Sequence, residues 1–295
     1  MKVLQAFVGC VAYALLWSAN ALYALVPDNW AYGFGGAIAA CIYPFFPKRR
    51  QIAVDNILQA GITADVKEAR RIARRSWCHL AGHIAEALKV PNVVTRDNWR
   101  AHLDETGAPP ETVKLLLEET NKPIILASAH HGVWEAATNL LSFARPMIAI
   151  SRTQNNPYVA KWMKMHHFRG PVTLIDKNHG FTTDALRQWQ REKAALTLLM
   201  DQHAGRKHGV KCDFMGREAW TFTTAARLAI RSGAPIVVGS FVRVAPFTYR
   251  LLGGTPLRYD RDADLAAATA ELNVRLAEAI RQYPDQYLWA HRRWR

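Results

Sequence analysis

The sequence predicts a layered α/β fold in which a mostly parallel central sheet is flanked by helices. From residue 122 onward, short apolar runs alternate with longer segments of helical periodicity, a pattern typical of strands joined by helical crossovers. The chain has 295 residues, of which 50% are hydrophobic, so it can bury a large core. This composition excludes a disordered chain and a small disulfide-stapled module. One main domain with an appendage is expected.

The first element is an uncharged run over residues 3–26, which as a helix would be about 36 Å long and could cross a bilayer. Only Lys2 precedes the run, whereas many basic residues follow it, so the positive-inside rule places the bulk of the protein in the cytoplasm. A cleaved signal peptide is the alternative, because residues 19–21 resemble a cleavage site. Residues 29–47 are also uncharged, but their glycines, prolines and aromatic side chains favour a segment that lies in the membrane interface.

These patterns divide the chain into a transmembrane anchor (1–28), an interfacial and helical segment that packs on the main domain (29–120), and the α/β domain itself (121–295). In the second part, Thr63 can cap a long amphipathic helix that Pro91 ends. In the third part, strands are expected at 124–128, 147–151, 172–175, 195–200 and 235–241, with 249–253 as a hairpin neighbour. Helices are expected near 134–143, 157–168, 181–192, 222–232 and 263–282.

The balance of charge favours an anionic partner. Lys and Arg outnumber Asp and Glu by 38 to 24, as would suit a nucleic acid, a membrane face or an acidic protein. The chain has no nucleic-acid-binding motif, and its uncharged amino-terminal run favours the membrane, so no nucleic-acid partner is expected. The four cysteines lie far apart without C-x-x-C spacing, which indicates reduced thiols in a cytosolic environment.

The stretch SAHHGVWEAA places two histidines and a glutamate at the end of the first expected strand, where sites of open α/β sheets gather. His130 and Glu135 are five residues apart and would diverge on a regular helix, so His130 must lie in the turn if the two side chains are to meet. His131 is four residues from Glu135, but Gly132 makes helical geometry at His131 doubtful. Spacing therefore leaves the choice open, with a lean to His130. A base, a metal ligand and a buried polar contact all fit this pattern.

A second polar group follows the strand expected at 195–200. Asp201 and His203 come directly after it, so they too should lie at an edge of the sheet where a site could form. Together with His130 and His131 they could bind a metal ion, but none of these residues makes a recognised ligand spacing, and no metal is expected.

Several blocks of the chain, taken in order, resemble the bacterial lipid A secondary acyltransferases, the lauroyl/myristoyl acyltransferase family, within the lysophospholipid acyltransferase superfamily. The likeness spans essentially the whole chain, and the combination of H-x-x-x-x-E with the block QYLWAHRR is specific. His131 and Val133 depart from the family's more usual residues. The blocks are FFPKRRQIAVDNI (45–57), His130 to Glu135, SRTQNNP (151–157), MDQHAGRKHGV (200–210), TFTTAARLAIRSGAPIV (221–237) and YPDQYLWAHRRWR (283–295).

The resemblance implies an acyltransferase-type fold and transfer of a fatty acyl chain from a thioester, usually on acyl carrier protein, to a hydroxyl of a membrane glycolipid. His130 would be the general base and Glu135 its partner, since an acceptor hydroxyl is a poor nucleophile until a neutral imidazole removes its proton. Arg152 matches an arginine of the family and would stabilise the oxyanion, with backbone N–H groups around Gly132 helping. No cofactor is implied.

The resemblance also assigns binding roles. Asp201, in the same block as His203, would orient the lipid headgroup or Arg152, with a structural hydrogen-bonding role as the alternative. Apart from the resemblance, Arg292 and Arg293 are interleaved with tryptophans, which suits a surface that faces the membrane interface or the carrier, with a solvated tail as the alternative. The protein would be anchored in the bacterial inner membrane with its catalytic domain in the cytoplasm. Two alternatives are an acyl-CoA-dependent phosphoglycolipid or lysophospholipid acyltransferase and a membrane protein that binds lipid without catalysis.

Overall fold

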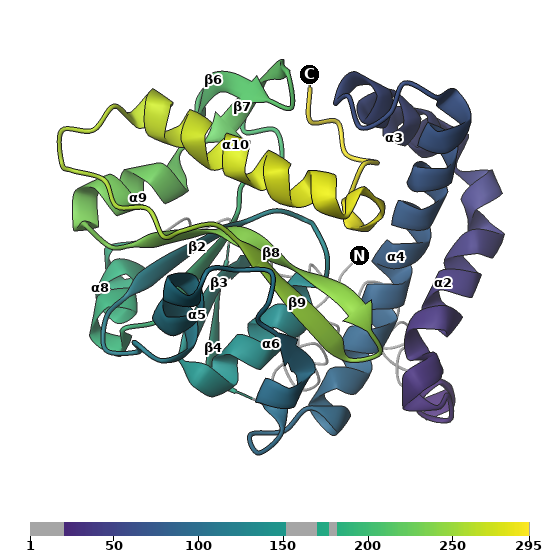
Figure 1. Cartoon of the computed structure of the whole chain (residues 1–295), viewed down its shortest axis with the longest axis horizontal. Helices are drawn as coiled ribbons and strands as arrows, with labels where there is room; N and C mark the ends of the chain where they lie inside the picture. The colour runs from purple at the N-terminus through teal and green to yellow at the C-terminus, as the bar shows by residue number, and fades with distance from the viewer. Residues whose placement is uncertain (1–20, 152–169, 177–181, 295) are drawn as a thin grey trace, which may run out of the picture.

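The computed structural model of the chain describes residues 21–151, 170–176 and 182–294 (Figure 1). Most of the predicted anchor (1–28), Arg152 and the helix expected at 157–168 therefore lie outside the described residues. Within the described residues, no helix combines the length and the apolar character that crossing a membrane requires.

The main sheet has seven strands in the order β1-β9-β8-β2-β5-β3-β4. Adjacent strands from β8 through β2, β5 and β3 to β4 run parallel, and β1 is parallel to β9. Only the pair β9–β8 of this sheet is antiparallel, so the predicted mostly parallel sheet is confirmed. Each predicted strand is present, and β8 runs four residues beyond its predicted end. The strands are β1 (Leu103–Asp104), β2 (Ile124–Ser128), β3 (Met147–Ser151), β4 (Val172–Asp176), β5 (Ala195–Leu199), β8 (Ile236–Ala245) and β9 (Thr248–Gly253).

Helices cover both faces of the sheet, as Figure 1 shows for α10 on one side and α5 and α6 on the other. The central strand β2 is buried throughout because its alternate side chains enter two cores. Ile125 and Ala127 pack with α9 and α10, while Ile124 and Leu126 pack with α5 and α6. The helices of this part are α5 (Pro110–Leu117), α6 (Trp134–Ala144), α8 (Thr183–Glu192), α9 (Thr224–Ser232) and α10 (Leu265–Gln282).

A two-stranded hairpin that the sequence reading missed lies beside α10. It consists of β6 (Gly209–Phe214) and β7 (Arg217–Phe222), which pair antiparallel. Met215 and Gly216 between them both have positive φ, as a two-residue hairpin turn of the primed type requires. The sequence signal for this hairpin is the alternation of apolar and polar side chains on both sides of Met215-Gly216.

A helical layer stands at the side of the domain in Figure 1, with the long helix α4 between the sheet and α2. Asp65, and not Thr63, caps α4 by accepting a hydrogen bond from the Lys67 amide. The prediction that Pro91 ends this helix is wrong: Pro91 lies inside the last turn, and the helix continues to Val93. The helices are α2 (Ala31–Ile42), α3 (Pro47–Gln59) and α4 (Val66–Val93), with short 3-10 turns η1 (Asp28–Trp30), η2 (Tyr43–Phe45), η3 (Trp99–His102) and η4 (Pro284–Gln286).

Helix α2 packs on α4 through small residues. A side chain at Gly35 would come within 2.6 Å of the Ala81 carbonyl oxygen, and one at Gly82 within 2.8 Å of the Tyr32 carbonyl oxygen. Because the small residues face inward, the large apolar side chains of α2 point outward: Phe34, Ile38 and Ile42 are 44%, 49% and 42% exposed. Within residues 29–120, which were predicted to be interfacial and helical, β1 is the edge strand of the main sheet.

Candidate active site

The register of the sheet brings the two predicted polar groups together. Strands β2 and β5 are parallel neighbours, and Ser128 pairs with Leu199 at their carboxyl ends. His130 and Asp201 each follow two residues later, and His130 Nδ1 lies 2.9 Å from Asp201 Oδ1. The expectation that both groups lie at one edge of the sheet is confirmed. The direct pairing of His130 with Asp201 was not predicted.

The surroundings of Asp201 keep it ionised. Its side chain is only 2% exposed, and this burial opposes ionisation, but the nearby His130 ring, hydrogen bonds from His130 and the charge of Arg293 together hold the pKa of Asp201 below its ordinary value. A carboxylate only accepts hydrogen bonds, so His130 Nδ1 carries the proton and donates. In the neutral ring, Nε2 then carries the lone pair that can accept a proton. The His130 side chain is 21% exposed, so a substrate can approach it.

Glu135 lies in the first turn of α6. Its carboxyl is close enough to interact electrostatically with the His130 imidazole. Burial raises the pKa of Glu135, and the nearby His130 partly offsets that rise. His130 precedes the helix, which begins at Trp134, so the prediction that His130 lies in the turn is confirmed. The role of Glu135 as its partner stays a prediction.

The turn that carries His130 is fixed from three directions. The Gly132 and Val133 amides donate to the Gln286 and Phe241 carbonyls, at 2.9 and 2.7 Å, and the Leu288 amide donates to the His130 carbonyl at 3.0 Å. Gly132 has φ +69°, and a Cβ there would fall on the Phe241 carbonyl oxygen, so only glycine fits. The expectation that amides around Gly132 help an oxyanion is wrong for these two, since both already donate within the protein.

The inner face of α4 supplies a polar wall behind this turn. His79 donates from Nε2 to the Gly132 carbonyl at 2.9 Å and accepts at Nδ1 from the Tyr32 hydroxyl at 3.0 Å. Burial lowers the pKa of His79 to about 4, so the ring is neutral with a fixed tautomer. About two turns after His79, Glu86 accepts hydrogen bonds from Arg243 and Tyr249, at 2.8 and 2.9 Å. The sequence alone did not predict a role for His79 or Glu86.

His83 lies between these two groups and is 1% exposed. Neither of its ring nitrogens has a hydrogen-bond partner within the described part of the chain. Its ring stacks on His79 at 5.8 Å and meets the edge of Trp134 at 4.2 Å, and Trp134 in turn meets His130 at 5.3 Å. An aromatic column thus runs from the interior of α4 to the His130 ring.

The carboxyl-terminal block supports the site from the other side. Arg293 is 1% exposed, and its guanidinium donates to the Gln202 and Trp220 carbonyls and to the Thr221 hydroxyl. Burial and the adjacent Asp201 raise the pKa of Tyr287 well above its ordinary value. Arg292, in contrast, is exposed, and His203 lies half-buried on the same turn as Asp201. The substrate-binding roles of Arg292, Arg293 and His203 stay predictions.

His131 points away from the solvent. It is fully buried and donates from Nε2 to the Tyr283 carbonyl at 3.1 Å, while burial lowers its pKa to about 4. Of the readings that the sequence leaves open, His131 thus makes a buried polar contact. Across the described ranges, no three His, Cys, Asp or Glu side chains gather closely enough to hold a metal ion.

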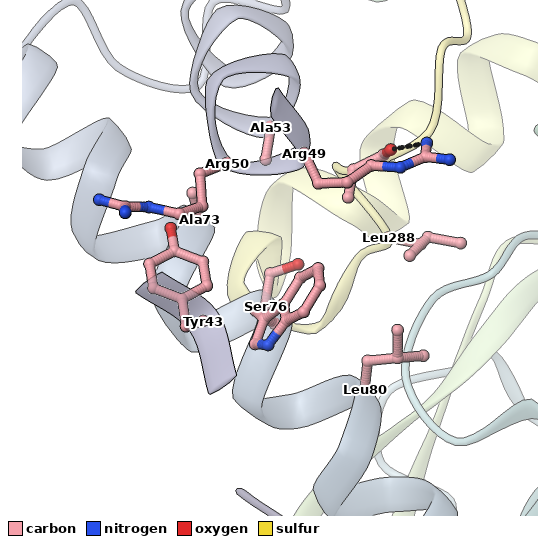
Figure 2. A pocket seen from close by; sticks show the side chains of 10 residues that line it. Tyr43, Arg49, Arg50, Ala53, Ala73, Ser76, Leu80 and Leu288 are labelled. Atoms are coloured by element: carbon pink, nitrogen blue, oxygen red, sulfur yellow. Dashed lines mark hydrogen bonds between the residues drawn. The ribbon is translucent and has the colours of Figure 1, made fainter. Parts of the chain in front are cut away.

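A small, shallow hollow, partly open to solvent, lies between α3, α4 and the carboxyl-terminal segment. Figure 2 shows Arg49 at its rim, donating to the Ala290 carbonyl, with Tyr43 and Ser76 nearby. The hollow shares Leu288 with the His130 turn but contains neither His130 nor Asp201.

An imidazole oriented by a carboxylate, at the carboxyl edge of a parallel sheet, defines a site equipped for general-base chemistry. The chain matches the model of the bacterial lipid A biosynthesis acyltransferase family over residues 4–295. It belongs to that family, and the resemblance seen in the sequence is confirmed.

Two curated relatives are similar over part of the chain. They are the lipid A biosynthesis palmitoleoyltransferase of Escherichia coli (strain K12) and the lipid A biosynthesis acyltransferase of Shigella flexneri. Each is 26% identical over 178 residues, which make up 59% of this chain and 56% of the relative. The matched region thus spans a little more than half the length of these relatives.

Proposed function

We propose that this protein is a membrane-associated O-acyltransferase that moves a fatty acyl chain from a thioester to a hydroxyl of a lipid A precursor or a similar glycolipid. The observation that carries this proposal is the 2.9 Å contact between His130 Nδ1 and Asp201, which leaves His130 Nε2 as an accessible base. Membership of the lipid A acyltransferase family supports the reaction and the class of acceptor.

In the proposed reaction, His130 Nε2 takes the proton of the acceptor hydroxyl as the oxygen attacks the thioester carbon. The tetrahedral intermediate then breaks its C–S bond, and the leaving thiolate takes the proton back from the imidazolium. The products are an ester and a free thiol, and the ring returns to its neutral form. Asp201 holds the ring and stabilises its positive form throughout, and Glu135 adds a second carboxyl beside it.

The remaining site residues take supporting roles in this proposal. Arg152 would stabilise the oxyanion. His203 and the exposed Arg292 would contact substrate, while Arg293 would act from the interior by fixing the segment after Asp201. The net charge of +14 suits an acidic donor such as acyl carrier protein, with acyl-CoA as the alternative.

The outward face of α2 supports association with the inner membrane. Phe34, Ile38 and Ile42 form an exposed apolar stripe, and the basic residues Lys48 and Arg49 follow it at the start of α3. Apolar side chains beside basic ones suit the boundary between acyl chains and anionic headgroups. Together with a single amino-terminal anchor, this face would hold the catalytic domain against the cytoplasmic leaflet.

The base is tested by assaying acyl transfer from acyl carrier protein to a lipid A precursor in detergent. His130→Ala should lower kcat by about 100-fold or more, with Asp201→Asn and Glu135→Ala also strongly impaired. His131→Ala is the matched control and should keep most of the activity, with thermal melting recorded for each variant. Near-normal transfer by His130→Ala would end this mechanism and favour a non-catalytic lipid-binding protein.

The donor is tested across a salt series at fixed detergent. Docking of acyl carrier protein on a basic surface should weaken as the Debye length shortens from about 10 Å at 0.1 M to about 3 Å at 1 M, whereas acyl-CoA should depend less on salt. A preference for acyl-CoA at every ionic strength would favour a phosphoglycolipid or lysophospholipid acyltransferase.

A further inference from the structure

We propose that Gln202 is a further catalytic residue, whose side-chain amide donates a hydrogen bond to the oxyanion of the tetrahedral intermediate. This inference rests on the proposed acyl transfer and assigns one more group to the same site. Its starting observation is that Gln202 Nε2 lies 3.4 Å from His130 Nε2, the nitrogen that takes the proton.

The hydrogen bonds of the site define which end of the amide faces the base. His130 Nδ1 must carry the proton because its partner, Asp201, is an ionised carboxylate. His130 Nε2 therefore accepts, and only the NH2 end of the Gln202 amide can donate to it. An amide oxygen in that place would face a second acceptor. Without substrate, the site thus presents the NH2 group of Gln202 to His130 Nε2, the nitrogen that acts as the base.

The acceptor hydroxyl must bond to His130 Nε2 before it reacts, so it displaces or shares the contact with Gln202. The oxyanion is attached to the carbon that this hydroxyl attacks, and so develops beside the acceptor oxygen. An amide that already reaches His130 Nε2 is within reach of that position. A neutral donor is suitable here, because it stabilises the new negative charge without competing with Asp201 for the imidazolium.

The main chain of Gln202 is fixed, as a preorganised donor requires. Its carbonyl accepts from the buried guanidinium of Arg293 at 3.1 Å, and the preceding Asp201 is held by His130. The Gly132 and Val133 amides, which were the expected backbone donors, already donate to carbonyls of the protein. Of the donors described around His130, Gln202 is the one aimed at the reacting nitrogen.

The test compares Gln202→Met, which keeps the length of the side chain and removes the donors, with Gln202→Glu, which keeps the shape and adds negative charge. Both should lower kcat by about 100-fold while the KM for donor and acceptor changes by less than about threefold, because the lost interaction forms only in the transition state. Gln282→Met on the exposed end of α10 is the matched control and should leave kcat unchanged.

A trifluoromethyl ketone analogue of the acyl donor gives a second readout, since it forms a tetrahedral adduct. Its affinity should fall with kcat in both Gln202 variants if the amide binds the oxyanion. Should Gln202→Met keep kcat within threefold of wild type, or raise only KM, the inference is wrong. If His130→Ala is inactive in that case, the proposed function still stands; if the wild-type protein transfers no acyl group, the proposed function itself fails. Thermal melting separates unfolding of one Gln202 variant from loss of catalysis, and the other variant then decides.

Discussion

The inner face of α4 and the outer face of α2 differ in polarity, and the difference is the reverse of that found in an ordinary surface helix. The inner face of α4 buries His79, His83 and Glu86 at 4%, 1% and 1% exposure. The outer face of α2 exposes Phe34, Ile38 and Ile42 by more than two fifths each. Polar side chains thus lie inside and large apolar ones outside, whereas a helix bordered by water shows the reverse.

The two faces thus have different neighbours: the inner face of α4 borders the turn that carries His130, and the outer face of α2, in our proposal, borders the bilayer. Of the inner polar groups, His79 holds the turn that carries His130, through its hydrogen bond to the Gly132 carbonyl. The outer apolar groups are tolerated because, in our proposal, they meet lipid. Substitutions on the two faces should therefore change different properties, the inner ones stability and catalysis, the outer ones binding to membranes.

The largest effect is expected at the inner turn from Gly132→Ala. The substitution combines a left-handed backbone with a Cβ placed on the Phe241 carbonyl, so the free energy of unfolding should fall by about 4 kcal/mol. Gly61→Ala is the control, since Gly61 also has positive φ but nothing within 4 Å, and should cost only about 1 kcal/mol. Chemical denaturation of both variants measures the difference, and equal losses would show that the turn can relax.

The buried histidines should make the protein sensitive to mild acid. Burial holds the pKa of His79 at about 4, against about 6.5 when unfolded, so its stabilising contribution is complete above pH 6.5 and is lost as the pH falls toward 4. At roughly 1.4 kcal/mol per pH unit, the loss from this residue reaches up to about 3 kcal/mol. Urea denaturation at several pH values gives the free energy of unfolding as a function of pH. This free energy should fall less steeply toward acid pH in His79→Gln than in wild type. An equal dependence on pH would contradict a neutral, buried His79.

A smaller effect of opposite sign is expected at His83. This ring is buried with no hydrogen-bond partner in the described ranges, so His83→Phe removes unsatisfied nitrogens and keeps an aromatic side chain against Trp134. The free energy of unfolding should stay equal or rise by up to about 1 kcal/mol. His79→Phe is the comparison on the same helix face and should be destabilising, because it leaves the Tyr32 hydroxyl and the Gly132 carbonyl without their partner. Equal changes in the free energy of unfolding for His83→Phe and His79→Phe would contradict the view that only His79 makes stabilising hydrogen bonds.

The smallest change in stability is expected on the outer face. Ile38→Asn should alter the free energy of unfolding by less than about 0.5 kcal/mol, because the side chain is already half exposed. Sedimentation with anionic phospholipid vesicles should nevertheless show weaker binding. Val274→Asn, at an equally exposed apolar position on α10, should leave vesicle binding unchanged. A loss of about 2 kcal/mol for Ile38→Asn would instead mean that this face packs against protein.

Much of the sheet could be predicted because its parallel strands are short, mainly apolar runs, as IILAS in β2 shows. Element ends were less predictable. The missed hairpin β6–β7 lies outside the main sheet, and its alternation of partly buried side chains is weak. Pro91 was a misleading signal, because proline removes one intrahelical hydrogen bond but the helix still continues to Val93.

For the site, the sequence indicated the right edge of the sheet but not the right contacts. That β2 and β5 are neighbours follows from strand order, which spacing along the chain does not encode, so the pairing of His130 with Asp201 required the fold. Glu135 was the predicted partner of His130 because it lies only five residues away in the sequence. Arg293 looked like a surface cation beside Trp294, yet its guanidinium is buried where three oxygen acceptors replace water.

The register between β2 and β5 also limits how this chain can change in length. His130 and Asp201 each stand two residues beyond paired strand ends, so deleting or inserting one residue in either short connection would rotate one partner away from the other. Insertions at the exposed residues 206–208 would leave that alignment intact. Among natural or engineered variants of this sequence, length differences compatible with activity should therefore collect after Gly205 and be missing from 129–130 and 200–201.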